Sequence, residues 1–268
     1  MDVLPFSDAS APTIVVRRAG PVATVSFNRP DVLNALDRAT LVAFVSNLRE
    51  QVADPGVRVI VVTGEGRAFC AGDDLAEAAT LDSAAFRAHI ETFQEVTLCL
   101  RSASQPVVAA IRGHAYGGGL ELALACDFRI AAHGAQFACP EVRWGLTATN
   151  GSTRLLPQLV GDARARSLLL LGEPIDATVA LACGLVTEVV EEDRLAAATD
   201  QLVARLLTLS PDALALTKQL LNERDEGPLA RVLQAETDAV MNAHAGLDAA
   251  EGMRAFSERR QPSFTEDS

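Results

Sequence analysis

The chain is poor in the positive charge that would bind nucleic acid. Its 268 residues include a single lysine, Lys218, and 35 acidic side chains outnumber 23 basic ones, which gives a net charge of -12 and a pI near 4.8. Such a chain repels the phosphate backbones of DNA and RNA and the surface of anionic membranes, so we expect none of these as the main partner. A phosphorylated small ligand remains compatible, because a helix N-terminus or a local arginine cluster binds phosphate.

Cysteine and histidine are also scarce and widely spaced. The cysteines are odd in number and contain no C-x-x-C, which excludes a disulfide framework and indicates a reducing compartment. The four histidines lack metal-ligand spacing, so we expect no bound metal. They are His89, His114, His133 and His244. Residues 1–5 lack the basic start of a secretion signal, and no run of about 18 apolar residues exists. We therefore expect a soluble, cytoplasmic protein with no membrane partner.

Two common catalytic fingerprints are missing. Neither G-x-G-x-x-G nor G-x-S-x-G occurs, so dinucleotide binding and a serine nucleophile have no support in the sequence. Aromatic residues make up only 4% of the chain, and the core should be aliphatic.

Hydrophobic periodicity predicts an α/β protein. The segments with strand patterns are residues 13–18, 22–27, 57–62, 106–111, 128–132, 136–137 and 185–190, and those with helical patterns are residues 38–52, 83–101, 120–126, 177–183, 212–222, 228–244 and 247–259. Strands are thus concentrated before about residue 190. We expect an α/β core over residues 1–200 and a helical region over residues 201–268, which packs on the core or supplies an oligomer interface.

Two glycine-bearing segments, each between a predicted strand and a predicted helix, carry most of the functional information. The first reads Ala-Phe-Cys-Ala-Gly-Asp-Asp-Leu at residues 68–75, and we expect Asp73 to begin a helix there. The second is the triplet Gly117-Gly-Gly before residues 120–126. Glycine at such a turn allows backbone N–H groups to point at one ligand atom, where they stabilise an oxyanion. The structural alternative is a plain strand-to-helix turn.

Glu121 and Glu141 are the candidate acid and base. Glu121 lies among leucines and alanines, and a buried carboxylate there needs a function or a partner. The structural alternative is an ion pair with Arg129 or Arg143, and for Glu141, after Pro140, it is a helix cap. When two carboxyl groups share a site that excludes water, the pKa of one is raised relative to that of the other. One group can then act as base and the other as acid.

With these segments in order, the chain resembles the crotonase superfamily, also called the enoyl-CoA hydratase/isomerase family. The resemblance extends over nearly the whole chain, through the motifs at residues 28–36, 68–75, 106–113, 117–123, 126–127, 135–141, 184–186 and 256–260. It implies a spiral of ββα units with a helical C-terminal trimerisation region, and a homotrimer or a dimer of trimers. It also implies a coenzyme A thioester as substrate and no separate cofactor.

The resemblance further assigns the site residues. It places an oxyanion hole on the N–H groups of Asp73 and Gly118, and it makes Glu121 and Glu141 the catalytic pair of a hydratase that converts trans-2-enoyl-CoA to 3-hydroxyacyl-CoA. We also expect the substrate to be bound around Arg29, Arg67, Ala68, Ala71, Gly72 and Gly117, the alternative for the two arginines being a solvated surface.

Other functions of the same fold remain compatible with the sequence. They are Δ3-Δ2 isomerisation, hydrolysis or C–C cleavage of a specialised acyl-CoA, and acyl-CoA binding without turnover. The chain also departs from the usual hydratase pattern: Asp73 replaces a small residue, Cys139 replaces a glutamine, and residues 145–153 lack the common Pro-Gly and paired glycines. These departures predict an altered acyl pocket.

Overall fold

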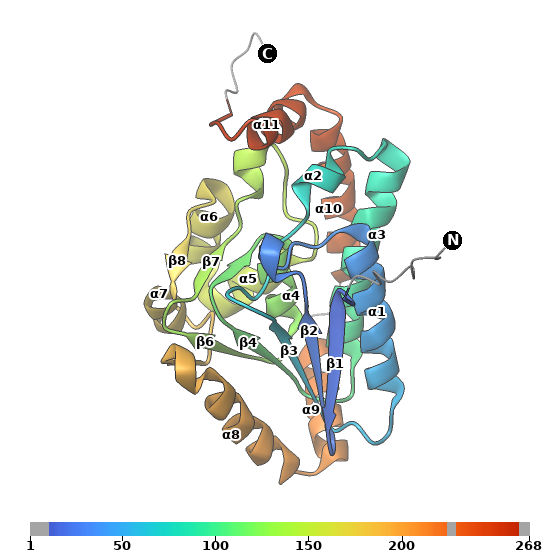
Figure 1. Ribbon diagram of the computed structural model, residues 1–268, viewed down its shortest axis with the longest axis vertical. Helices are drawn as coiled ribbons and strands as arrows, with labels where there is room; N and C mark the ends of the chain where they lie inside the picture. The colour runs from blue at the N-terminus through green and yellow to red at the C-terminus, as the bar shows by residue number, and fades with distance from the viewer. Residues whose placement is uncertain (1–10, 224–228, 263–268) are drawn as a thin grey trace, which may run out of the picture.

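The computed structural model describes residues 11–223 and 229–262. The expectation for residues 1–5 and the predicted helix start at Pro228 lie outside this part of the chain. The main sheet has six strands in the order β1-β2-β3-β4-β6-β9 (Figure 1). Their bounds are Ile14–Ala19, Val22–Phe27, Val59–Gly64, Val107–Ile111, Phe128–Ala132 and Glu188–Val190. The first two, both predicted as strands, form an antiparallel hairpin, and every later neighbour pair is parallel.

A second, smaller sheet lies beside the first and contains β5 (His114–Tyr116), β7 (Gln136–Ala138) and β8 (Ile175–Asp176). The strand β5 was not predicted. It is only three residues long and lies between the loop that follows β4 and the glycine triplet, too short for a strand pattern to be recognised. Its parallel pairing with β7 lines up Tyr116 with Ala138. This second sheet sets the position of the glycine triplet.

Helices cover the sheet and then dominate the C-terminal third, as the periodicity predicted. In chain order they are α1 (Arg38–Ala53), α2 (Leu75–Ala78), α3 (Ser83–Ser102), α4 (Gly118–Ala125), α5 (Ser152–Val160), α6 (Asp162–Leu171), α7 (Ala177–Ala182), α8 (Leu195–Leu207), α9 (Pro211–Glu223), α10 (Leu229–His244) and α11 (Leu247–Ser257). In Figure 1, α8 and α9 lie at one end of the molecule and α11 lies at the other. The expected domain boundary at residue 200 falls inside α8.

The main sheet separates two hydrophobic cores, because its parallel strands are apolar on both faces. Along β3, Ile60 and Val62 point into the larger core with residues of α1, α3 and α4. The alternate residues Val59 and Val61 point into a second core with Leu195 of α8. Alternation along a strand thus explains why a short β-branched segment is buried throughout.

The helix α7 begins with a side-chain cap. The Asp176 side chain accepts from the N–H of Val179 at 2.8 Å, so it is the N-cap of α7. The last strand is shorter than the predicted 185–190, because β9 begins only at Glu188. Leu185 and Val186 are buried in the segment before it.

Gly64, the last residue of β3, offers a test of the packing beneath the site. A Cβ atom at this position would lie 2.3 Å from the carbonyl oxygens of both Ala68 and Phe69. Backbone atoms cannot move aside cheaply, so we expect Gly64→Ala to lower the melting temperature by roughly 10 °C, the shift that about 3–4 kcal/mol produces in a chain of this size. Gly134→Ala is the matched control, because its Cβ would meet nothing nearer than 4.0 Å. Equal melting temperatures for the two variants would contradict this packing.

Candidate active site

Asp73 does not begin a helix, contrary to the prediction from sequence. The helix α2 starts at Leu75, and the side chain of Asp74 is its N-cap. Asp73 instead forms a parallel bridge with Leu36, in which the flanking residues make the hydrogen bonds: Leu36 N donates to Gly72 O at 2.8 Å, and Asp74 N donates to Leu36 O at 3.1 Å. The N–H of Asp73 is therefore directed away from Leu36. Within residues 11–223 and 229–262 it has no protein acceptor.

Gly118 supplies a second unpaired amide. It is the first residue of α4, where backbone N–H groups have no intrahelical acceptor. The preceding Gly117 has φ +50° and donates its own N–H to Ala138 O at 2.9 Å, which anchors the turn to β7. Among the described residues the N–H of Gly118 donates to no protein acceptor.

The two segments meet at Gly72. Its φ of +97° is in the left-handed region, and a Cβ atom there would lie 2.7 Å from Tyr116 O and 3.3 Å from Gly118 N. Only glycine permits this approach. The backbones that carry the Asp73 and Gly118 amides therefore lie in contact, although 45 positions separate the two residues in the numbering of the sequence.

Glu121 is a buried carboxylate held by hydrogen-bond donors, and Arg129 is not among them. Its Oε1 accepts from Thr149 N at 3.1 Å, Asn150 N at 3.0 Å and Ser152 Oγ at 2.6 Å, and its Oε2 accepts from Thr149 Oγ1 at 3.3 Å.

Arg129, the first arginine considered as a partner for Glu121, is used elsewhere. Its guanidinium is buried and donates to the carbonyl oxygens of Ala123, Cys126 and Leu185.

Glu141 has a different environment. It opens the short 3-10 helix Glu141–Trp144, and a Cβ atom on Gly117 would lie 3.2 Å from its Oε1. Burial raises the pKa of Glu141 to about 8, and the negative charge of Glu121 adds to the rise. The raised pKa favours the protonated form of Glu141 at neutral pH.

A third glutamate supports the loop that holds Glu121. Glu236, on α10, accepts from Gly151 N at 2.6 Å and from Thr153 N at 3.3 Å, and it also contacts Thr153 Oγ1. Burial, followed by the charge of Glu121, raises the pKa of Glu236 to about 7. The loop between Glu141 and α5 is consequently fixed from the C-terminal region.

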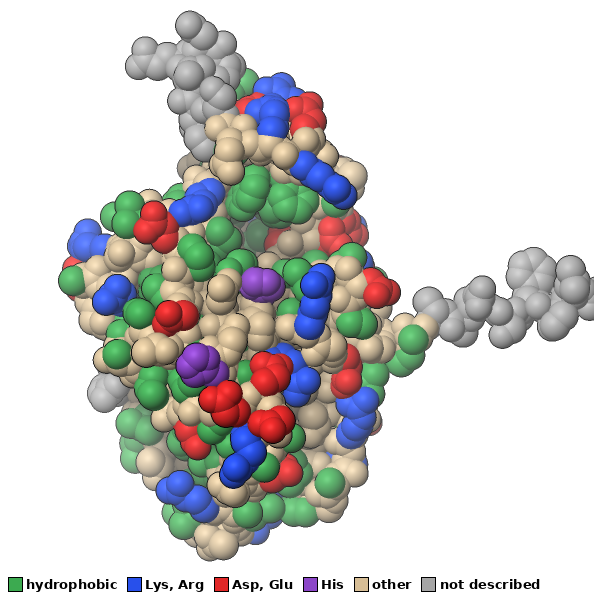
Figure 2. Space-filling view, turned by 60° about the vertical axis from the view of Figure 1, so that its left-hand side comes forward, with side chains coloured by type: hydrophobic (Ala, Val, Ile, Leu, Met, Phe, Trp, Pro, Cys, Tyr) green, Lys and Arg blue, Asp and Glu red, His purple; other side chains and the backbone are tan. Residues whose placement is uncertain are grey.

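These groups line one cavity of about 670 Å³. Asp73, Gly118, Glu121 and Glu141 contribute to its wall, together with Ala71, Gly72 and Gly117 and with apolar side chains (Phe86, Ile90, Phe93, Trp144, Leu146, Val240 and Phe256). In the space-filling view the surface is hollowed below the end that carries α11, and hydrophobic side chains border the hollow (Figure 2).

Three predicted substrate residues are not among the described lining residues of this cavity: Arg29, Arg67 and Ala68. The guanidinium of Arg29 donates to Ala35 O and pairs with Asp37 at 3.1 Å and with Asp74 at 3.2 Å. Arg67 is exposed, and Ala68 is buried with its carbonyl accepting from Asn34 Nδ2 at 2.8 Å. Contact of these residues with coenzyme A stays a prediction.

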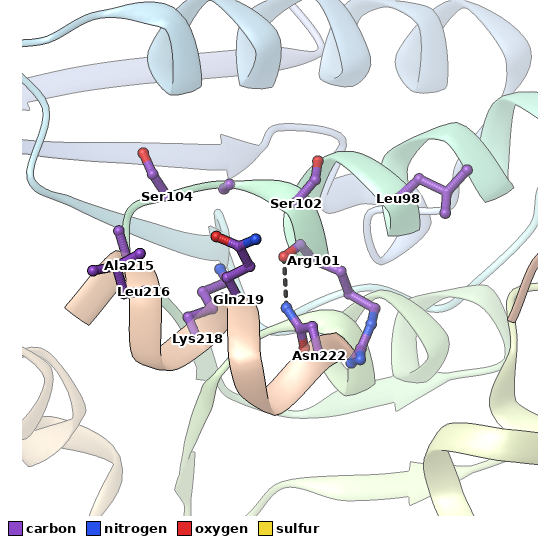
Figure 3. A pocket seen from close by; sticks show the side chains of 10 residues that line it. Leu98, Arg101, Ser102, Ser104, Ala215, Leu216, Lys218, Gln219 and Asn222 are labelled. Carbon is purple, nitrogen blue, oxygen red and sulfur yellow. Dashed lines mark hydrogen bonds between the residues drawn. The ribbon is translucent and has the colours of Figure 1, made fainter. Parts of the chain in front are cut away.

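A separate pocket lies between the end of α3 and α9 (Figure 3). Its lining includes neither Glu121 nor Glu141. The ammonium of Lys218 is already satisfied there, with Leu100 O and Gln105 O at 3.0 Å each and Asp127 at 2.8 Å. Asn222 Nδ2 donates to Arg101 O at 2.8 Å. These bonds fasten α9 to the core.

In the part of the chain that the structure describes, no cluster of His, Cys, Asp or Glu has the composition of a metal site. Within the same residues no helix combines the length and the hydrophobicity needed to cross a bilayer.

Sequence reasoning missed the residues that hold the predicted site residues. Thr149 and Asn150 precede α5 and Ser152 is its first residue, positions where such residue types indicate helix capping, so nothing pointed to Glu121. His89 was set aside with the other histidines, yet its Nε2 lies 2.7 Å from Asp73 Oδ1.

Solved structures with the same fold are enoyl-CoA hydratases and related proteins of the crotonase type. One, an enoyl-CoA hydratase from Mycobacterium avium subsp. paratuberculosis, superposes with a TM-score of 0.87 at 33% identity and covers 96% of this chain and 100% of its own. The family model described as enoyl-CoA hydratase/isomerase matches residues 17–267. The chain belongs to this family and is an enzyme of the crotonase superfamily.

Curated relatives cover nearly the full length. A crotonyl-CoA hydratase from Syntrophomonas wolfei is 36% identical over 252 residues, which is 94% of this chain and 97% of the relative. A 2,3-dehydroadipyl-CoA hydratase from Escherichia coli is 36% identical over 251 residues, 94% of this chain and 98% of the relative.

Proposed function

We propose that the protein adds water to the double bond of a trans-2-enoyl-CoA and produces a 3-hydroxyacyl-CoA. One observation carries the proposal: a glutamate held by hydrogen-bond donors and a glutamate with a raised pKa line the same cavity as two residues whose backbone amides have no acceptor among the described residues. The hydratase names of relatives at 34–37% identity support the same reaction.

The amides of Asp73 and Gly118 bind the thioester carbonyl oxygen in this scheme. Their hydrogen bonds stabilise the enolate that forms when a nucleophile attacks Cβ. Each donor of this kind contributes about 3–4 kcal/mol to lowering the barrier.

Glu121 is the base and Glu141 is the acid. Glu121 takes a proton from water while the hydroxyl adds to Cβ, and Glu141 gives its proton to Cα. Glu141 then carries the charge and Glu121 the proton, so a proton transfer between the two carboxyls restores the starting state. All atoms come from water and the acyl-CoA, and the scheme requires no metal or redox cofactor.

An acyl-CoA panel tests the reaction. We expect trans-2-enoyl-CoA to gain the mass of one water, with loss of the enoyl ultraviolet absorbance. Conversion of 3-enoyl-CoA to 2-enoyl-CoA without hydration would instead identify an isomerase, and release of free coenzyme A would identify a hydrolase. Binding by calorimetry with no product across the panel would show a non-catalytic family member.

The family resemblance implies assembly through the helical C-terminal region, and we also propose that copies of the chain associate there through α9. Leu216, Leu220 and Leu221 of this helix are more than half exposed, and Leu98 of α3 adds to the same apolar surface. Such a patch favours an interface.

Light scattering should give an integral multiple of the 28.3 kDa chain, with a trimer as the expected state. Leu216→Ser/Leu220→Ser should lower that mass toward one chain, whereas Leu181→Ser, an exposed leucine on α7, should not. A single-chain mass for the unmodified protein would contradict the proposal.

A further inference from the structure

Asp73 presents a carboxylate to the cavity beside its own backbone amide. Its Oδ1 lies 2.7 Å from His89 Nε2, and the side chain is 18% exposed. Among the residues described, no protein group donates to its Oδ2. One oxygen of the carboxylate is thus fixed by the protein and the other is available to a ligand.

His89 is built to hold this one contact. Its side chain is only 1% exposed and packs edge-on against Phe93, with ring centroids 5.3 Å apart. Its Nδ1 is buried without a partner in the described part of the chain. Because a carboxylate oxygen only accepts, Nε2 is the donor, and the imidazole fixes the orientation of Asp73.

The other acidic groups of the cavity are already accounted for. Asp74 pairs with Arg29, Glu121 accepts from four donors, and Glu141 is protonated at neutral pH. Asp73 Oδ2 is therefore the anionic acceptor left for a ligand, next to the apolar walls of Phe86, Ile90 and Phe93. The side chain is partly exposed at the cavity, so this oxygen is accessible to a ligand donor.

The position of this acceptor limits where the donor can be. The amide and the carboxylate belong to one residue, so a ligand whose carbonyl oxygen meets the amide can reach the carboxylate only with a group a few bonds away. We propose that Asp73, positioned by His89, is a specificity-determining residue that selects acyl groups bearing a hydroxyl near the thioester over plain alkyl groups. This inference rests on the proposed binding of acyl-CoA.

Calorimetry with unreactive ligands tests it separately from catalysis. The probes are the amide-linked analogues of 4-hydroxybutyryl-CoA and pentanoyl-CoA, which differ by a hydroxyl in place of a methyl and can be neither hydrated nor lactonised. We expect the unmodified protein to bind the hydroxyl analogue roughly 10-fold more tightly or better, as a site that hydrogen-bonds a ligand hydroxyl rejects the analogue without it. Asp73→Ala should abolish the preference. Asp31→Ala, an exposed carboxylate outside the cavity, should preserve it.

His89 variants test the positioning role. His89→Leu should reduce the preference for the hydroxyl analogue, and His89→Gln, which keeps a side-chain donor, should restore part of it. Equal loss of affinity for both analogues in Asp73→Ala would overturn the inference, because it would mean that Asp73 meets the coenzyme A portion. An unchanged preference would also overturn it. Failure of hydration with the preference intact would sink only the proposed reaction.

Discussion

Glu121→Gln is expected to lower kcat for enoyl-CoA hydration by about 10²–10⁴, the range for loss of a positioned general base. The carboxyl group accepts from Thr149, Asn150 and Ser152, and these hydrogen bonds fix its orientation. An amide cannot accept a proton from water, and its nitrogen cannot accept these hydrogen bonds. KM should change much less than kcat, because the base acts on water during the chemical step.

The control for this variant removes the same charge elsewhere. Glu188→Gln changes an exposed residue of β9 and should leave kcat unchanged. Circular dichroism and the melting temperature would establish that Glu121→Gln is folded. Full hydration of crotonyl-CoA by a folded Glu121→Gln protein would falsify the assignment of the base.

Glu141→Gln should give a comparable loss of kcat and should remove a pH limb. The unmodified enzyme needs Glu141 protonated, and the pKa of this group is raised to about 8 by burial and by the charge of Glu121. We therefore expect kcat to hold below about pH 8 and to fall above it. In Glu141→Gln the small remaining rate should lack this fall. A wild-type rate that is flat through pH 9 would contradict the role of Glu141 as acid.

The same raised pKa makes a stability prediction of definite sign. The folded state binds the Glu141 proton more tightly than the unfolded state, whose carboxyl has the ordinary pKa of 4.5. The free energy of unfolding therefore falls as pH rises from about 4.5 to about 8, and the penalty is complete above that range. Glu141→Gln removes the penalty. Its melting temperature at alkaline pH should exceed that of the unmodified protein by at least ~2 °C, the shift for about 1 kcal/mol.

Much of the framework was predictable because it depends on local patterns. The β-branched segment before Gly64 and the apolar segment after Pro106 became β3 and β4, and both are buried because helices or a second core cover each face. The family assignment, made from motifs spread over the chain, is confirmed by the family model and by the solved structures.

The interactions that decide chemistry were less predictable, since they join residues distant in sequence. No local pattern pairs Asp73 with His89, because the contact requires the turn after Gly72 to fold against α3. The expected helix start at Asp73 was wrong for the same reason: pairing with Leu36 takes precedence over helix propensity at that position.

The contacts of Glu236 connect the C-terminal region to the candidate active site. Its carboxyl group, on α10, accepts hydrogen bonds from the backbone N–H groups of Gly151 and Thr153. The neighbouring residue Asn150 donates to Glu121. A truncated chain ending at Glu223 would lack Glu236, and the segment would lose these hydrogen bonds. Such a protein should keep both amides and both glutamates and still turn over slowly, because the segment that supplies the donors to Glu121 would lose its contacts with Glu236.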